Sequence, residues 1–186
     1  MNAIDAILTR RTIQIFSDEP VPKSVISQAL FAAIHAPNHR HTWPWRFYAL
    51  GPKSREVFAD ILLKYKLAKA NEPASDLKIA SMREKFLTPA EAILFGIKKS
   101  NDEKIRREDY ASLACAIQNA SLYLHSQGYG SKWSTGKFEN DEAVFSLIKE
   151  SSEEIELAGV LWIGKPKVIP PMAKRPELES LVRYLD

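Results

Sequence analysis

Two arginines and a hydroxyl side chain stand next to one another at Arg10, Arg11 and Thr12, at the end of a short helix predicted over residues 2–11. A guanidinium group pairs with a phosphate through two parallel hydrogen bonds, so these side chains could hold a dianionic phosphate. The alternative is that the arginines complement the negative C-terminal dipole of the helix. Surface arginine pairs are common, and local sequence alone favours this second interpretation.

A second group of polar and aromatic side chains fills residues 38–47, where two histidines, two arginines and two tryptophans surround Pro44. Burying all of them would leave polar groups without partners, which is costly, so we predict a loop. No cysteine or carboxylate lies at ligand spacing from His39 or His41, and we therefore predict no metal site. The composition suits a loop beside an aromatic, anionic ligand.

A third group of hydroxyl side chains lies in residues 131–137, around Trp133, Ser134, Thr135 and Gly136. We predict a turn over this segment. Its backbone N–H groups could point at a ligand, as they do in other turns that bind anions.

These groups must be positioned by helices and strands, and the most informative of these elements is a helix predicted over residues 108–130. The segment contains no proline, and Gly128 and Gly130 are suited to ending a helix. Apolar residues recur at steps of three and four on one face, namely Leu113, Ala116, Ile117, Ala120, Tyr123 and Leu124. The opposite face carries no charge either, and such a helix is normally enclosed by protein. One chain of this length encloses it only partly, so we predict a homodimer.

The remaining periodicity predicts a single domain over residues 1–186. Further helices are predicted at 24–36, capped by Ser24, and at 54–69. Another follows the loop at 70–76 and ends at about residue 86, and a short one runs from Asn140 or Asp141 to residue 148. Strands are predicted at 46–50, 92–97 and 156–163. Loops are predicted at 70–76 and, as a solvated segment, at 98–103.

The composition is that of a globular protein, with 45% hydrophobic and 26% charged residues. A net charge of +3 without a stripe of lysines and arginines gives no case for nucleic-acid binding. The single cysteine, Cys115, falls inside the predicted buried helix, which favours a reducing compartment. No apolar run approaches the roughly 20 residues that cross a bilayer, and residues 1–5 show no signal-peptide pattern. We therefore expect a cytoplasmic protein with no membrane partner.

The order of these motifs along the chain resembles that of the nitroreductase family, and within it the small, minimal-length members. The family's Arg-Arg-Ser-x-Arg-x-Phe pattern is matched by Arg-Arg-Thr-Ile-Gln-Ile-Phe at residues 10–16. Its Pro-Trp-x-Phe strand entry is matched by Pro-Trp-Arg-Phe at residues 44–47. Its Gly-x-x-Trp-x-x-Gly turn is matched at residues 130–136. The resemblance covers essentially the whole chain.

The resemblance implies an α+β fold in which helices flank a mostly antiparallel central sheet, in an intertwined homodimer with FMN at the subunit interface. It identifies the helix at 108–130 as the centre of the dimer. It implies that Arg10 contacts the FMN phosphate, with Thr12 as a hydroxyl donor. The residues that it places at the cofactor are Arg10, Arg11, Thr12, Gln14, His35, His39, Trp43, Trp133, Ser134, Thr135 and, from the tail, Lys174 and Arg175.

The activity implied is that of an FMN-dependent oxidoreductase, in which hydride passes from NAD(P)H through flavin N5 to a nitroaromatic, a quinone or a similar electron-poor acceptor. The cofactor performs this reaction, so no catalytic side chain is expected. Two positions depart from the family, because Gln14 replaces a cation facing the N1–O2 edge and Trp43 replaces a glutamine. One alternative is therefore a flavin-binding protein of this fold without reductase turnover, for storage, sensing or flavin breakdown. Another is an interaction module that docks a partner through residues 43–45.

Overall fold

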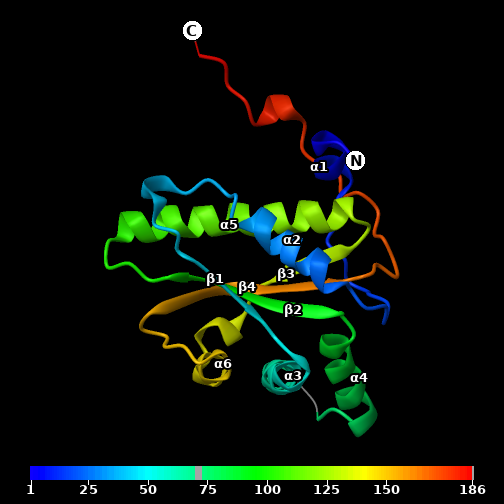
Figure 1. Cartoon of the computed structure of the whole chain (residues 1–186). Helices are drawn as coiled ribbons and strands as arrows, with labels where there is room; N and C mark the ends of the chain where they lie inside the picture. Colours follow the sequence, from blue (N-terminus) through cyan, green and yellow to red (C-terminus); the bar gives the residue numbers. More distant parts are fainter. Residues whose placement is uncertain (70–72, 186) are drawn as a thin grey trace.

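A four-stranded antiparallel sheet forms the middle of the computed structural model, which describes residues 1–69 and 73–185 (Figure 1). The strands are β1 (Trp45–Ala49), β2 (Glu91–Lys98), β3 (Gly130–Ser134) and β4 (Ile155–Gly164). Their order in the sheet is β1-β2-β4-β3, and each neighbouring pair is antiparallel. The sheet confirms the predicted α+β class.

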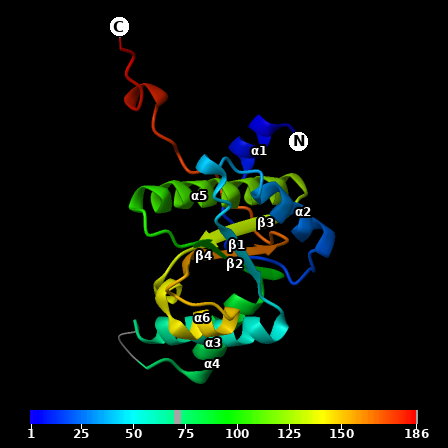
Figure 2. The ribbon, with the colours of Figure 1, turned by 60° about the vertical axis from the view of Figure 1, so that its left-hand side comes forward.

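Helices cover both faces of this sheet. On one face lie α2 (Lys23–Ala33) and α5 (Glu103–Ser126), with α1 (Ala3–Thr9) against the end of α5 (Figure 1). On the other face lie α3 (Pro52–Leu67), α4 (Asp76–Leu87) and α6 (Glu142–Ile148), as Figure 2 also shows. Short 3-10 turns are η1 (His39–His41), η2 (Lys137–Asn140) and η3 (Leu178–Ser180). Of the predicted loop at 70–76, residues 70–72 lie outside the described residues.

The two central strands, β2 and β4, are buried on both faces because helices cover both sides of the sheet. Their side chains alternate between two cores, as the period of two in a strand requires. Phe95 and Ile97 join the core under α2 and α5, whereas Leu94 joins the core under α3 and α6. This explains why both strands read as continuous apolar runs in the sequence.

The central helix begins earlier than predicted. Asp102 caps α5 by accepting hydrogen bonds from the backbone N–H groups of Lys104 and Ile105, at 2.8 and 3.2 Å. The predicted loop at 98–103 is confirmed at residues 99–102, whereas residue 98 ends β2 and residue 103 starts the helix. The first turns of α5 are charged and exposed, so they lack the uncharged pattern that predicted the helix from residue 108 onward. The helix ends at Ser126, and Gly128 follows with a φ of 79°.

The two faces of α5 have different surroundings. Ala116 is 0% exposed because it packs against the chain's own sheet. Cys115, one residue earlier, is exposed, so the prediction that it is buried is wrong for a single chain. Ala111 and Gln118 are exposed on the same side as Cys115. One chain therefore encloses only half of this helix.

Two further expectations are corrected by the structure. Ser24 does not cap α2, because the helix begins at Lys23 after Pro22 and no side chain caps it. The turn predicted at 131–137 is instead strand β3, which pairs with β4 through residue 134. The segment is too short and too polar for its alternation to show in the sequence. Within the described part of the chain, no helix is long and apolar enough to span a bilayer.

Candidate functional site

The end of α1 is held against the start of β3, and this places the first predicted group of residues. Asn2 caps α1 by accepting a 2.9 Å hydrogen bond from the Asp5 N–H, and the helix ends at Thr9, with Arg10 as its C-cap. The chain then turns, and the Ile13 N–H donates to the Ser131 carbonyl at 3.1 Å. A side chain at position 130 would collide with Ile13, so Gly130 permits this close approach.

Positive charge accumulates at this end of the molecule. Burial lowers the pKa of the half-buried Arg10 below its ordinary value, and the neighbouring Arg11 and Arg175 lower it further. Both ion pairs found among the described residues lie elsewhere, so no carboxylate there forms an ion pair with these three arginines. An anion bound here would relieve repulsion that the chain itself leaves uncompensated.

The two neighbouring arginines have different roles. The Nη1 of Arg11 donates to the carbonyls of Leu8 and Arg10, at 2.8 and 2.9 Å, and so caps the end of α1. The helix-capping interpretation therefore applies to Arg11. Arg10 makes no such bond to the helix end, and its nearest charges are other cations. The anion-binding interpretation applies to Arg10.

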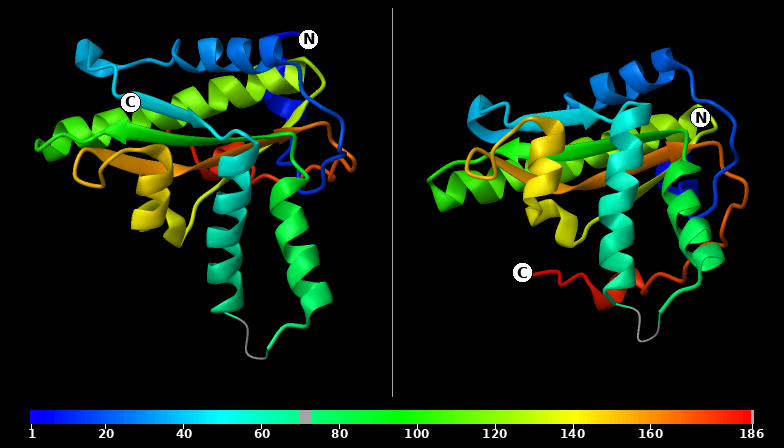
Figure 3. Two further views of the ribbon diagram at one scale, coloured as in Figure 1. Left: turned by 60° about the horizontal axis from the view of Figure 1, so that its bottom comes forward. Right: turned by 90° about the horizontal axis from the view of Figure 1, so that it is seen from below.

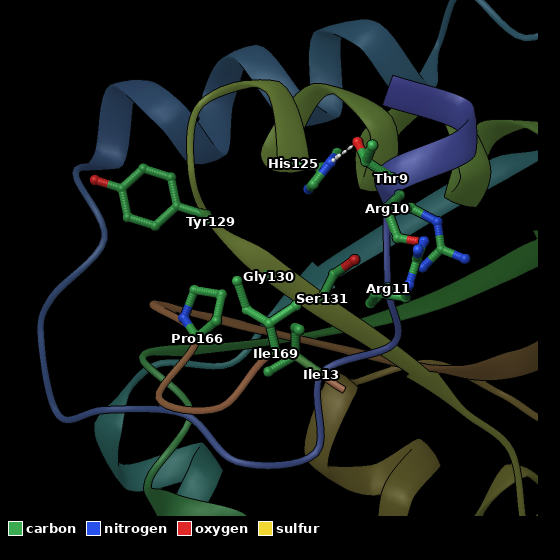
Figure 4. A pocket seen from close by; sticks show the side chains of 10 residues that line it. All are labelled: Thr9, Arg10, Arg11, Ile13, His125, Tyr129, Gly130, Ser131, Pro166 and Ile169. Carbon is green, nitrogen blue, oxygen red and sulfur yellow. Dashed lines mark hydrogen bonds between the residues drawn. The ribbon is translucent and has the colours of Figure 1, made fainter. Parts of the chain in front are cut away.

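A small pocket lies between the end of α1, the end of α5 and the start of β3 (Figure 4). Its volume of about 30 Å³ holds one or two water molecules, so a larger ligand would have to lie over its opening. His125 lines this pocket beside Arg10 and Arg11, and its Nε2 is 2.8 Å from the Thr9 Oγ1. No motif in the sequence indicated His125, because it is a lone histidine in the last turn of a helix.

Strand β3 leads from this pocket to the third predicted group. The Trp133 indole N–H donates to the Ala158 carbonyl at 2.8 Å, which fixes the ring. The Ser134 Oγ is buried and has no hydrogen-bond partner among the described residues. Buried hydroxyls are normally paired, so this atom is a candidate ligand contact. Thr135 follows immediately and is exposed.

The second predicted group, which we call the tryptophan loop (residues 38–45), has an unusual backbone. Arg40, His41 and Trp43 have φ values of 60°, 52° and 45°, in the left-handed region that residues other than glycine rarely adopt. Each such residue costs on the order of 1 kcal/mol, so the surroundings must hold the loop in place. The loop is therefore shaped by its neighbours and not by local preference.

A buried carboxylate on α5 supplies that support. Asp109 is 3% exposed, and its Oδ1 accepts hydrogen bonds from the Thr42 hydroxyl at 2.5 Å and from the Asn38 amide at 3.3 Å. The Asn38 side chain in turn accepts the Trp43 backbone N–H at 2.9 Å. Because the network satisfies these groups, it compensates for the strained backbone.

The loop presents an aromatic surface to solvent. Trp43 is 54% exposed and stacks on His41, with ring centres 5.0 Å apart and planes within 2°. Its other neighbour is Trp45, whose indole N–H donates to the Ser112 Oγ of α5 at 3.1 Å. His39 is exposed on the same loop. His35 lies at the end of α2, with its Nδ1 2.8 Å from the Phe31 carbonyl.

Two groups of predicted cofactor residues, those of the tryptophan loop and those at the end of α1, thus lie at opposite ends of α5. The tryptophan loop contacts α5 at Asp109, and the end of α1 contacts it at His125. Figure 3 shows from two sides that these two segments lie near opposite ends of α5. A helix rises 1.5 Å per residue, so these contacts are about 24 Å apart. Gln14 and Lys174 are exposed on segments of the arginine side. Within one chain the two groups do not form a single site.

Comparisons with known proteins agree with the family resemblance of the sequence. The Nitroreductase family model matches residues 7–164. The chain is 30% identical over 171 residues to the Bacillus subtilis (strain 168) protein named "Putative NAD(P)H nitroreductase YfhC", covering 92% of this chain and 88% of that one. Its structure is similar to a nitroreductase-like family protein from Bacillus cereus, with TM-score 0.85 and 23% identity over 100% and 96% of the two chains. It is also similar to a variant of the FMN and NADPH-dependent nitroreductase NfnB derived from Sphigopyxis sp. strain HMH, with TM-score 0.80 and 15% identity over 99% of each.

Proposed function

The chain belongs to the nitroreductase family, and from this premise we propose that it is an FMN-dependent oxidoreductase that uses NAD(P)H as its reductant. The observation that carries the proposal is the uncompensated charge of Arg10, Arg11 and Arg175 beside the start of β3. The names of the relatives support the cofactor and the reductant, since one is an NAD(P)H nitroreductase by name and another is FMN and NADPH-dependent.

The residues on this side of the molecule fit FMN. Arg10 and Arg175 would hold the phosphate, and the Thr12 hydroxyl would donate to it. Ser134 lies four residues beyond Gly130 along β3, or about 13 Å at the rise of a strand. Its orphaned Oγ and the following Thr135 are candidates for contact with the ring of the same cofactor. Gln14 and Lys174 remain predicted contacts on the same side.

Bound FMN supplies hydride transfer at N5, from NAD(P)H to a nitroaromatic, a quinone or another electron-poor acceptor. The chain's own residues bind the phosphate, orient the ring and exclude water. No side chain has to act as a nucleophile. The tryptophan loop offers a flat, exposed surface on which a planar acceptor could stack.

The site is completed by a second copy of the chain in this proposal. Ala111, Cys115 and Gln118 leave a face of small, uncharged residues on α5 that the chain does not cover. In an isologous dimer packed across this face with antiparallel helices, the tryptophan loop of one protomer lies beside the arginines of its partner. The two groups that one chain keeps about 24 Å apart then form one site.

Exposed apolar residues elsewhere support the same homodimer. The tail extends away from the rest of the chain and exposes Leu178, Leu181 and Tyr184 to solvent (Figures 1 and 2). Contiguous exposed apolar groups of this kind mark interaction surfaces. Light scattering at micromolar concentration checks this, and a monomeric mass would contradict it.

The absorption spectrum of the purified protein tests the function. We expect a yellow protein whose visible absorbance bleaches when NADH or NADPH is added without oxygen and returns on addition of a nitroaromatic or a quinone. A yellow protein that neither nucleotide bleaches would favour the alternative, a flavin-binding protein without turnover. A colourless protein that takes up no flavin would overturn both.

A further inference from the structure

Thr9 links His125 to the end of α1 through a contact at the Nε2 of the imidazole ring. The Thr9 hydroxyl donates its one hydrogen to the Asp5 carbonyl, with Oγ1 2.6 Å from that oxygen. The same Oγ1 lies 2.8 Å from the His125 Nε2. With the hydroxyl hydrogen directed at the Asp5 carbonyl, Oγ1 accepts a hydrogen bond from Nε2. In that arrangement neutral His125 carries its proton on Nε2, and Nδ1 is the nitrogen that can accept one.

Cations surround this histidine on the side of α1. Arg10 and Arg11 line the same pocket, and Tyr129 is the remaining titratable group in the lining (Figure 4). The loop after β4 contributes the uncharged Pro166 and Ile169 to the lining, and it adds one more cation nearby, because the Lys165 Nζ lies 5.5 Å from the centre of the Tyr129 ring. Burial and the two arginines lower the pKa of His125, so the imidazole is neutral near pH 7 when no anion is bound.

Protonation at Nδ1 requires no rearrangement, because the Nε2 bond to Thr9 persists in the imidazolium. The ring would gain one positive charge beside the predicted position of the phosphate. A dianion that approaches Arg10 supplies the negative charge that the three arginines lack, and it therefore favours the charged form of the neighbouring ring. The structure thus holds a residue that is neutral without the ligand and can become a cation with it.

We propose that His125 is part of the phosphate-binding site, taking up a proton from solvent at Nδ1 when the FMN phosphate binds and holding that phosphate as an imidazolium together with Arg10. This inference rests on the proposed function, since it needs FMN to bind at the arginines. It assigns a role to a residue that no motif of the chain indicated. It also makes FMN binding tighter at lower pH.

Calorimetry of FMN binding to the apoprotein in buffers of different ionisation enthalpy counts the protons taken up. The matched variant is His125→Gln, whose amide can still donate to Thr9 but cannot take a proton. We expect the wild type to take up more protons than H125Q near pH 6.5, by a difference that approaches one and vanishes at pH 9. The FMN phosphate has its own ionisation near pH 6, and the difference between the two proteins cancels it.

Affinity gives a second measure of the same effect. Losing one charge-assisted hydrogen bond should weaken FMN binding by H125Q about tenfold at pH 6 and much less at pH 9. Riboflavin, which lacks the phosphate, should bind both proteins equally. Gln127→Ala, at the same end of α5, should behave as the wild type. Nitrogen-15 shifts of the wild-type imidazole, with and without FMN, report its protonation even where H125Q fails to fold.

The outcomes separate this inference from the proposed function. Equal proton counts in the wild type and H125Q, or an imidazole that stays neutral with FMN bound, would overturn the role of His125 and leave the cofactor in place. Equal losses of FMN and riboflavin affinity would show that H125Q acts only through structure, and this also overturns it. A wild type that binds no FMN contradicts the proposed function and this inference together.

Discussion

The two ends of α5 differ in whether their polar and charged groups already have partners within the chain. At one end, Arg10, Arg175 and His125 sit close together without a negative partner among the described residues. At the other end, the tryptophan loop has a strained backbone, but Asp109 and its hydrogen bonds already compensate for it. The arginine end gains from the arrival of an anion, whereas the tryptophan loop is complete without a ligand. Substitutions at the first should therefore change affinity, and those at the second should change stability.

The largest effect should come from preventing the proposed dimer, so that the tryptophan loop of one protomer cannot lie beside the arginines of its partner. Cys115→Glu adds a charge to the face of α5 that one chain leaves exposed, so each protomer folds but the proposed dimer has to bury unpaired charges. That costs several kcal/mol, and we expect monomers that bind FMN at least a hundredfold more weakly. Light scattering and flavin fluorescence measure the two effects.

The matched control for Cys115→Glu carries the same substitution at the next residue along the helix. Ala116→Glu buries a charge in the chain's own core, and it should unfold the protomer itself. Circular dichroism distinguishes an unfolded chain from a folded monomer. A dimeric Cys115→Glu protein with unchanged FMN affinity would mean that α5 is not the interface.

Removing Arg10 should separate affinity from stability. Arg10→Ala deletes one member of a charge-assisted pair with the phosphate, which is worth about 1.5–3 kcal/mol, so FMN affinity should fall roughly ten- to hundredfold. The apoprotein should lose no stability, because the change also removes repulsion from Arg11 and Arg175. By contrast, Arg11→Ala should destabilise the end of α1, because its side chain caps that helix. Equal FMN affinity in Arg10→Ala and the wild type would place the phosphate elsewhere.

Removing Asp109 should show the opposite behaviour. Asp109→Leu leaves the Thr42 hydroxyl and the Asn38 amide without their buried acceptor, at a cost of about 1–3 kcal/mol in the free energy of unfolding. Asp109→Asn keeps an acceptor oxygen and should lose less. Urea denaturation of the apoproteins measures both variants. A fully stable Asp109→Leu protein would show that the strained loop is held by something other than this network.

A smaller effect is expected from restoring the cation that the family usually has at Gln14. A cation near the N1 edge stabilises the reduced, more negatively charged cofactor more than a neutral amide does, by about 1–2 kcal/mol. Because 1.4 kcal/mol corresponds to about 30 mV for two electrons, Gln14→Arg should raise the midpoint by roughly 20–45 mV. Trp43→Gln restores the other departure and serves as the comparison. Spectroelectrochemistry decides, and an unmoved midpoint means that Gln14 does not face the flavin.

The smallest effect concerns the stability of the apoprotein in acid. The pKa of His125 is lowered in the folded chain, so below its ordinary value near 6.5 the unfolded chain binds more protons. Stability should therefore decline as the pH falls from about 7 toward 5, and less so in H125Q. Thermal melting points at both pH values check this. Identical declines would mean that His125 is not perturbed in the apoprotein.

The long elements of the fold could be predicted from periodicity alone. Strand β2 lies within one residue of its predicted bounds at each end, because covered sheets demand continuous apolar runs. Strand β3 could not be predicted, because its five residues are short and polar and owe their conformation to pairing with β4. The start of α5 was missed for a similar reason, since its charged first turns resemble a solvated loop.

The candidate site divides in the same way. The sequence placed Arg10, Trp43 and Ser134 at a cofactor through the order of the motifs, and these assignments stay predictions. It could not separate the roles of Arg10 and Arg11, which depend on which backbone carbonyls lie within reach. It also gave no sign of His125, whose neighbours come from α1, more than a hundred residues earlier.

The sequence by itself determined the family, the α+β class and the residue types available for an anion and an aromatic ligand. Those properties follow from local patterns and motif order, which survive without knowledge of contacts. The tertiary structure decided that these residues lie at opposite ends of α5, and which face of that helix stays uncovered. Both depend on the direction in which each side chain leaves the helix once it packs on the sheet. The adjacent residues Cys115 and Ala116 lie on different faces of the helix, so the first is exposed and the second is in the core.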